Sequence, residues 1–261
     1  MRHRNNIFLL VQAVIFLCLF SVNVYAATTE TEEKQAAAQQ DDWEFALSFY
    51  VWMPDIETTT ASGHELEITF SDILDNLDMT LMTSFGARKD KWTFMTDVVY
   101  LHLNYSDNIN IGSLLKVTDL HMKNVIVSPA ASYEIMGGEK GSLQLLAGAR
   151  FLWIELGLDL ETLPPLPSKK TDDDADGDVW DGIVGVRGRL NLTDRWFMPY
   201  RFDIGTGDSD KTWQAMGGFG YRFDKVKVLA IYRYMKWDFG NDSPMDDLKV
   251  YGPMVGAIYT F

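Results

Sequence analysis

The chain has 261 residues, of which 47% are hydrophobic and 13% aromatic, and it carries a formal net charge of −14. This acidic balance argues against nucleic acid as a partner and indicates a solvated acidic surface. Cys18 is the only cysteine, so no disulfide within the chain stabilises the fold.

The first 26 residues have the features of a secretory signal peptide. Arg2 and Arg4 precede an apolar run over 7–22, and Val24-Tyr25-Ala26 fits a small-x-Ala cleavage site. Because this apolar run is slightly long for a signal peptide, an uncleaved membrane anchor is the alternative. Residues 27–42 are polar and lack aromatic side chains, which predicts a periplasmic linker. The remaining chain has no apolar run of the roughly 20 residues that a spanning helix needs.

From residue 43 onwards the hydrophobic period changes to two, which predicts β-strands. We expect ten strands, with eight or twelve as alternatives, over 43–54, 78–89, 91–104, 116–136, 142–160, 179–193, 195–207, 212–224, 225–240 and 248–261. Tight turns at 90, 137–141, 194 and 224–225 alternate with longer polar joins over 55–77, 105–115, 161–178, 208–211 and 241–247. Short turns on one rim, long loops on the other and both termini on the periplasmic side are typical of outer-membrane barrels.

The predicted strands separate an apolar face from a polar one. In 212–224, Trp213, Phe219 and Tyr221 share one face, and Gln214 and Arg222 share the other. A transmembrane barrel turns the first kind of face to lipid and encloses the second, whereas a soluble periplasmic barrel does the reverse. The glycines on the polar face suit a narrow lumen and favour the membrane form. The sequence therefore predicts an all-β, closed antiparallel transmembrane barrel over 43–261.

The last predicted strand ends on an aromatic residue. A strand edge left open exposes unpaired backbone, so we expect this strand to pair with the first one and close the barrel. Gly256, Tyr259 and Phe261 also resemble the C-terminal signal of bacterial outer-membrane barrels, although Met254 stands where a polar residue is usual. This resemblance implies that the barrel assembly machinery is a partner during membrane insertion.

Twelve charged residues fall on the predicted lumen face. They are Glu44, Arg88, Asp97, Glu134, Arg150, Asp181, Arg187, Arg189, Arg201, Asp203, Arg222 and Arg233. Since unpaired charge is unfavourable inside a low-dielectric tube, we expect these residues to form a paired network. The excess of arginine suits a constriction that selects small anions. A packed polar plug is the alternative that we favour, because ten strands leave little room in the lumen.

An acidic segment in the third long join is a weak candidate for a metal site. Asp172, Asp174, Asp176 and Asp178 alternate along the chain, as the ligands of a calcium loop do. The twelfth position of such a loop needs Glu, and Ile183 stands there instead. We therefore favour a solvated acidic loop, with loose binding of divalent cations near lipopolysaccharide phosphates as the alternative.

Two histidines near the second long join offer the one catalytic hypothesis. A lipid-modifying hydrolase needs a base, a nucleophile and an orienting carboxylate, for which His102 or His121, Ser106 and Asp119 are candidates. Both histidines fall on the lipid-facing parity, so we interpret them as interfacial residues.

Residues 71–77 follow a short helical pattern. We expect this segment to pack against the barrel rim, because it is too short to be stable alone, and an amphipathic lid at the membrane surface is the alternative.

Three stretches resemble one family. They are the segment WEFALSFYVWMP over 43–54, the segment SDILDNL over 71–77 and Tyr251-Gly252-Pro253, with Gly-Ala-Arg over 148–150 as a weaker fourth. The chain resembles small, largely uncharacterised proteobacterial outer-membrane β-barrel proteins. This resemblance implies a porin-like barrel with a closed or narrow lumen, and it supplies no catalytic residue.

These observations together predict a protein exported to the outer membrane of a Gram-negative bacterium. The expected role is non-enzymatic, in contact with outer-membrane lipid and lipopolysaccharide, and either structural or adhesive through acidic external loops. A narrow porin-like channel for small solutes is the first alternative, and a lipid-modifying hydrolase is the second. No cofactor is expected.

Overall fold

The computed structural model describes residues 43–60, 65–105, 109–111, 115–162, 170–240, 243 and 245–261. They belong to the second of two compact units, which spans Asp41–Phe261. The signal peptide and linker predicted over 1–42 lie outside the described residues. No helix among the described residues is long and apolar enough to cross a membrane.

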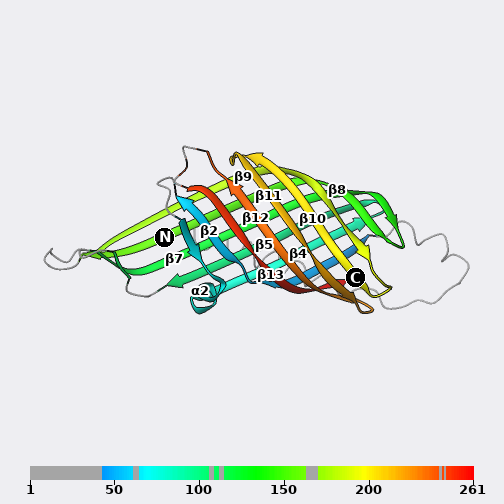
Figure 1. The fold of residues 1–261 in the computed structure, drawn as a ribbon, viewed down its shortest axis with the longest axis horizontal. Coiled ribbons are helices and arrows are strands. Elements are labelled where there is room, and N and C mark those ends of the chain that lie inside the picture. The colour runs from blue at the N-terminus through cyan, green and yellow to red at the C-terminus, as the bar shows by residue number, and fades with distance from the viewer. Residues whose placement is uncertain are drawn as a thin grey trace, which may run out of the picture. The chain divides into compact units, whose positions relative to one another are not determined.

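Ten antiparallel strands form the wall of the barrel (Figure 1). They are β1 (Glu44–Trp52), β4 (Leu77–Lys89), β5 (Trp92–Tyr105), β7 (Leu115–Gly138), β8 (Gly141–Thr162), β9 (Lys170–Asn191), β10 (Trp196–Gly207), β11 (Lys211–Arg222), β12 (Val226–Asp238) and β13 (Met245–Thr260). The joins contain β2 (Asp55–Thr60), β3 (Glu65–Ile68), α2 (Phe70–Asp75) and β6 (Ile109–Ile111). The prediction of a ten-stranded all-β antiparallel wall is confirmed.

The first and last wall strands close the barrel. Ala46 of β1 is opposite Thr260 of β13, and Trp52 is opposite Met254. Phe45 and Phe261 exchange two backbone hydrogen bonds of 2.9 Å, so the pairing continues to the last residue. This pairing leaves neither strand with an open edge at this seam, as the sequence predicts.

Gly256 fits the closest approach at the seam. A Cβ atom on Gly256 would lie 2.5 Å from the Cβ of Tyr50 and 2.8 Å from the carbonyl oxygen of Phe49. Tyr259 of β13 and Phe261, which directly follows that strand, are the other two residues of the predicted assembly signal; both are exposed, and their ring centroids lie 5.9 Å apart. The structure therefore places all three residues of that signal at or beside the closing seam.

The outer surface carries two sets of aromatic side chains. At the tight-turn end, Trp92 packs against Tyr133 with ring centroids 5.0 Å apart. Towards the opposite end, Trp213, Tyr234 and Tyr251 stack with successive centroid distances of 4.8 and 5.5 Å. The surface between the two sets is apolar and includes Val184, Phe219, Val228, Tyr232 and Val255. Aromatic girdles on either side of an apolar band are characteristic of a barrel that spans a membrane.

The prediction that residues 55–77 form a loop is wrong. β2 follows β1 in the chain and pairs with the same neighbour, β13, so that Asp55 is opposite Tyr251. β3 then pairs with β2 in the antiparallel direction. α2 then leads to β4 and begins with a capping box: Thr69 accepts the Asp72 N–H and Asp72 accepts the Thr69 N–H. The Thr69 hydroxyl, which donates to Asp72 Oδ2 at 2.6 Å, and the Thr69 N–H hold the pKa of the Asp72 carboxyl below its usual value. The predicted helix is therefore present, and Ile73 is its buried residue.

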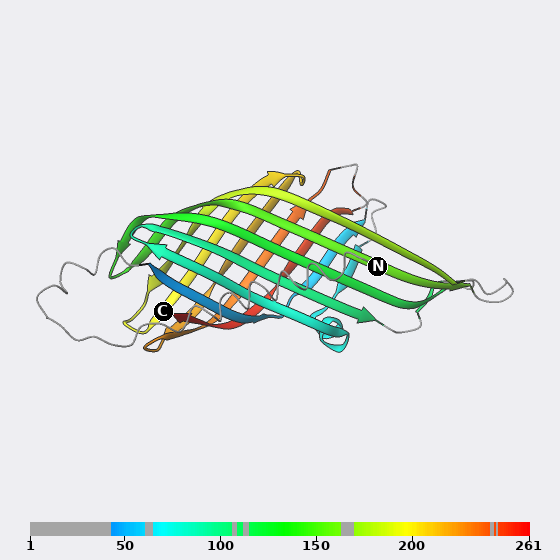
Figure 2. The same cartoon turned by 180° about the vertical axis from the view of Figure 1, so that it is seen from behind.

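The prediction of a loop over 161–178 is also wrong in part. β8 runs to Thr162 and β9 begins at Lys170, with Leu160 opposite Thr171 and no register shift along the pair. Figures 1 and 2 show β7, β8 and β9 reaching beyond the other wall strands at one end of the barrel. The uninterrupted ladder of backbone hydrogen bonds holds this acidic sequence in strands despite the low strand propensity of Asp.

Candidate functional site in the barrel interior

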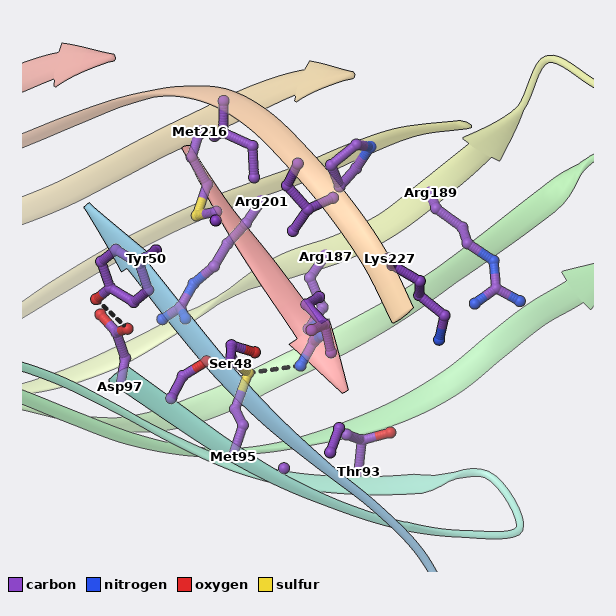
Figure 3. A pocket seen from close by; sticks show the side chains of 18 of the residues that line it. Ser48, Tyr50, Thr93, Met95, Asp97, Arg187, Arg189, Arg201, Met216 and Lys227 are labelled. Carbon is purple, nitrogen blue, oxygen red and sulfur yellow. Dashed lines mark hydrogen bonds between the residues drawn. The ribbon is translucent and has the colours of Figure 1, made fainter. Parts of the chain in front are cut away.

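The inward side chains of the wall form three layers. Nearest the tight turns is a cavity of about 310 Å³, here called the vestibule. A layer of paired charges, the ionic layer, lies beyond it, and a packed apolar cluster, the apolar plug, lies beyond that. Figure 3 shows the side chains around the vestibule and the nearer part of the ionic layer.

Asp203 is the centre of the ionic layer. Its carboxylate accepts hydrogen bonds from Arg150 Nη2 at 2.5 Å and from Arg201 Nε at 2.7 Å. Arg150 and Asp203 are 0% exposed, and Arg150 Nη1 also donates to Thr212 Oγ1 at 2.9 Å. Buried charges of this kind are tolerated only when they are paired and hydrogen-bonded, so the layer behaves as one unit.

Gln214 links Asp203 to a second ion pair. Its Nε2 donates to Asp203 Oδ2 at 3.3 Å, and its Oε1 accepts from Arg233 Nε at 3.0 Å. Arg233 Nη1 lies 2.8 Å from Asp97 Oδ2, and the Tyr50 hydroxyl donates to Asp97 Oδ1 at 2.6 Å. Side chains from β1, β5, β8, β10, β11 and β12 thus form one polar network across the lumen.

The apolar plug fills the lumen beyond the ionic layer. Its buried members are Trp52, Ile56, Ile73, Met82, Val99, Leu101, Leu103, Met122, Ile126, Leu152, Ile231, Met235, Trp237, Leu248, Val250 and Met254. Met235 and Trp237 are fully buried. The guanidinium of Arg233 lies 4.8 Å from the centre of the Trp52 ring and that of Arg150 lies 5.7 Å from the Trp237 ring. These cation–π contacts connect the plug to the ionic layer.

The apolar plug contradicts the expectation of a lumen face made mainly of polar residues and glycine. A signal was present in β5, where residues 98–101 are Val-Val-Tyr-Leu and leave neither face polar. Since one apolar face of such a strand forms the outer surface of the barrel, an apolar opposite face indicates apolar packing in the lumen, where Val99 and Leu101 are buried. The vestibule cavity is lined by Ile231 and Met254 of the apolar plug but not by Trp52, Met235 or Trp237, so it ends at the near side of the plug.

The vestibule is lined by an excess of cations. Arg88, Arg187, Arg189 and Lys227 line it, together with Glu44. Arg88 pairs with Glu134 at 3.1 Å. Lys227, which is not among the predicted lumen residues, completes the cationic lining.

Two predicted lumen residues lie towards the rims. Asp181 is buried beneath the β10–β11 turn, where it accepts hydrogen bonds from the backbone N–H of Ser209 at 3.1 Å and from its hydroxyl at 2.8 Å. Arg222 donates to Asn191 Oδ1 at 2.6 Å and covers the Phe197 ring at 4.4 Å. Neither has a carboxylate–arginine pair among the described residues, so they stand apart from the ionic layer.

The candidate metal site does not have the geometry of a calcium loop. Asp172, Asp174, Asp176 and Asp178 lie at alternate positions of β9 and not in a turn. A strand separates such positions by about 6.6 Å along a straight line, whereas a calcium loop wraps its ligands around the ion. Asp176 and Asp178 are exposed, and the side chains of Asp172 and Asp174 lie outside what the structure describes. The described residues contain no cluster of three possible metal ligands.

The two histidines occupy diagonal positions on neighbouring strands. His102 is opposite Lys123 and Asn104 is opposite His121, so His102 and His121 share the outer face of the β5–β7 pair. His102 Nδ1 lies 3.0 Å from Asp78 Oδ2. Ser106 and the side chain of Asp119, the other members of the hydrolase hypothesis, lie outside the described residues.

No family model and no curated protein matches the chain. Among solved structures, it is similar to Ail, the attachment invasion locus protein of Yersinia pestis, at 13% identity and a TM-score of 0.38, over 84% of this chain and 98% of that one. It is similar to Neisserial surface protein A at 12% identity and a TM-score of 0.35, over 84% and 97%. It is also similar to the toluene transporter TbuX of Ralstonia pickettii at 14% identity and a TM-score of 0.37, over 84% and 73%. Similarities at this level identify no function for the chain.

Proposed function

We propose that this chain is an integral protein of the outer membrane of a Gram-negative bacterium, with a non-enzymatic structural or surface-interaction role. The observation that carries the proposal is the inverted polarity of the barrel. Charged residues such as Arg150 and Asp203 are fully enclosed, whereas Val184 and Phe219 of the outer apolar band are 59% and 52% exposed. In water this arrangement would expose a large apolar belt to solvent, which is unfavourable, whereas in a bilayer the same belt contacts lipid.

The asymmetry of the two barrel ends supports an orientation. The tight turns and the paired residues Phe45 and Phe261 lie at one end, which we assign to the periplasm. The opposite end carries α2 and the extended strands β7, β8 and β9 (Figure 2). This extension is acidic in sequence, with Asp176 and Asp178 exposed, and it would meet lipopolysaccharide and external partners. Residues 1–26 would direct export as a cleaved signal peptide, and the barrel assembly machinery would insert the barrel.

Cysteine labelling tests this orientation directly. Once residues 1–26 are removed, the chain has no cysteine, so each introduced thiol is the only one present. We expect Asp176→Cys to react with a membrane-impermeant maleimide on intact cells. Asp194→Cys, in the tight turn between β9 and β10, should react only after the outer membrane is permeabilised. Labelling of both variants, or of Asp194→Cys alone, on intact cells contradicts the proposed orientation.

Mobility on gels tests membrane integration itself. A closed barrel in detergent migrates differently before and after boiling, because it stays folded until heated. We expect the wild-type protein to sediment with membranes, to resist extraction by carbonate and to show two mobilities. A single mobility combined with full solubility without detergent would contradict the proposal.

A narrow channel for small solutes is the second candidate function. It is favoured by the open vestibule and its excess of arginine. The ionic layer and the apolar plug oppose it, since both fill the lumen with packed side chains. Discrete single-channel steps from the wild-type protein in planar bilayers, altered in Arg150→Ala or Arg201→Ala, would favour the channel over the structural role.

A further inference from the structure

Three cations in the vestibule lack a carboxylate partner among the described residues. Arg187 contacts the sulfur of Met95, and Lys227 Nζ lies 3.4 Å from the Thr260 hydroxyl. The buried Nε of Arg189 has no hydrogen-bond partner. A donor left unsatisfied in a buried position is unfavourable, so such a site calls for an acceptor.

These cations surround one space. Arg187 and Arg189 are two positions apart on β9, which puts them on the same face about 6.6 Å apart. Lys227 lies at the start of β12, and all three line the vestibule cavity (Figure 3). Arg187, Arg189 and Lys227 therefore bring three positive charges to the lining of one cavity.

The number of unpaired charges in the vestibule indicates the charge of the ligand. Among the cations that line the vestibule, Arg88 pairs with Glu134, Arg233 pairs with Asp97, and Arg201 pairs with Asp203, which it shares with Arg150 of the ionic layer. The other three cations face Glu44, which forms no ion pair in the described part of the chain, so these four residues together carry two uncompensated positive charges. Hydrogen phosphate and sulfate each carry two negative charges, and their oxygens match the donor fork of arginine.

We propose that the vestibule binds a divalent oxyanion, phosphate or sulfate, held by Arg187, Arg189 and Lys227. The cavity of about 310 Å³ has room for this group and several waters. The ionic layer and the apolar plug close the far side, so the anion enters and leaves through the tight-turn end. The assignment of that end to the periplasm rests on the proposed function, whereas the binding itself does not.

Calorimetry on the purified full barrel in detergent tests the site with sodium phosphate and sodium sulfate at constant ionic strength. We expect saturable binding of either anion by the wild-type protein, and none of chloride. The double variant Arg189→Gln/Lys227→Gln should weaken binding by about ten- to a hundredfold, as expected for the loss of charge-assisted hydrogen bonds. Arg195→Gln is the matched control, because Arg195 lies in an exposed turn at the same end and donates to the Tyr221 hydroxyl. This control should bind as the wild type does.

A further titration distinguishes the sources of the anion. If glycerol phosphate binds at least tenfold more tightly than inorganic phosphate, the site recognises the terminal group of a larger molecule. Equal or weaker binding assigns it to the free ion. Should the double variant lose its heat-modifiable mobility, the single variant Lys227→Gln takes its place, with weaker binding still expected.

The proposal is overturned if the wild-type protein binds neither phosphate nor sulfate saturably. It is equally overturned if folded Arg189 and Lys227 variants bind as tightly as the wild type. Failure of the labelling experiment with retained phosphate binding would remove the orientation alone, so the two proposals fail separately.

Discussion

Arg187 of β9 stands directly opposite Arg201 of β10, so two cations share one cross-strand position on the lumen face. Like charges in this arrangement destabilise a sheet. Arg201 is compensated by Asp203 at 2.7 Å, whereas no carboxylate pairs with Arg187 among the described residues. The pair therefore predicts opposite effects of the same substitution at its two positions.

Arg187→Gln should stabilise the barrel in phosphate-free buffer, because it removes the repulsion and an unpaired charge. The gain in unfolding free energy should be about 0.5–1 kcal/mol, the magnitude of a cross-strand charge pair. Arg201→Gln is the matched control and should destabilise, since Asp203 loses a partner. Urea unfolding in detergent measures both, and a loss of stability in Arg187→Gln would contradict the argument.

Asp203→Asn should be among the most damaging single substitutions in the lumen. It leaves Arg150 and Arg201 buried without their shared counter-charge. Removing one partner of a buried ion pair typically lowers the free energy of unfolding by about 3–5 kcal/mol. Asp194→Asn, in an exposed turn, should change it by less than about 0.5 kcal/mol. Equal unfolding midpoints for the two variants would show that the ionic layer does not stabilise the barrel.

Trp237→Ala should open the apolar plug. Trp237 is fully buried in the lumen, and its removal leaves a space beside Arg150. We expect discrete conductance steps in planar bilayers that the wild-type protein lacks. Trp180→Ala, which removes an exposed ring from the outer surface, should show no such conductance steps. Because truncating a buried tryptophan also lowers stability by about 3–5 kcal/mol, heat-modifiable mobility must first show that the variant is folded.

Val184→Arg should test whether the outer band faces lipid. Val184 is exposed, so in a water-soluble barrel this substitution would be almost neutral. In the middle of a bilayer an arginine on the lipid face lowers stability by about 2–4 kcal/mol. Leu192→Arg, in a turn beyond the apolar band, is the control and should cost about 0–1 kcal/mol. Unfolding from lipid bilayers that shows no difference between the two would reject a lipid-facing band.

Gly256→Val should prevent closure of the barrel. The new side chain would overlap Tyr50 and the Phe49 carbonyl, and both belong to the strand that β13 must join. We expect loss of the heat-modifiable form and of membrane-integrated protein. Gly177→Ala, where an added Cβ meets nothing within 4 Å, should assemble normally. Normal assembly of Gly256→Val would show that the seam tolerates a wider spacing.

The wall strands could be predicted from the sequence because apolar and polar residues alternate within each strand, independently of its neighbours. In β11, Trp213 and Gln214 already point to opposite faces whatever their neighbours are. The join over 55–77 could not be predicted in this way, since β2 becomes a strand by pairing with distant β13. The same holds for the acidic part of β9, which stays extended through its pairing with β8.

The interior could be predicted only as a set of inward residues. Alternation brings Asp97 and Arg233 to the lumen, but their contact depends on the curvature and register of the strands between β5 and β12, five in one direction around the wall and three in the other. Lys227 could have been predicted, because it lies in the predicted strand 225–240 and shares the parity of Arg233, which was assigned to the lumen. The apolar plug was not predicted, because large apolar residues were assigned to the outer face of the barrel.

The pairing of Phe45 with Phe261 also sets the order of events in biogenesis. β1 is the first wall strand to be exported, but β13, one of the two strands with which it pairs, is the last. During that interval the two edge strands of the incomplete sheet have unpaired backbone groups with which other chains can pair. Contacts between segments so far apart in the sequence also form slowly. Closure is therefore a late step that depends on the whole polypeptide. A chaperone that shields both edge strands until then would have the greatest influence on the yield of assembled barrel.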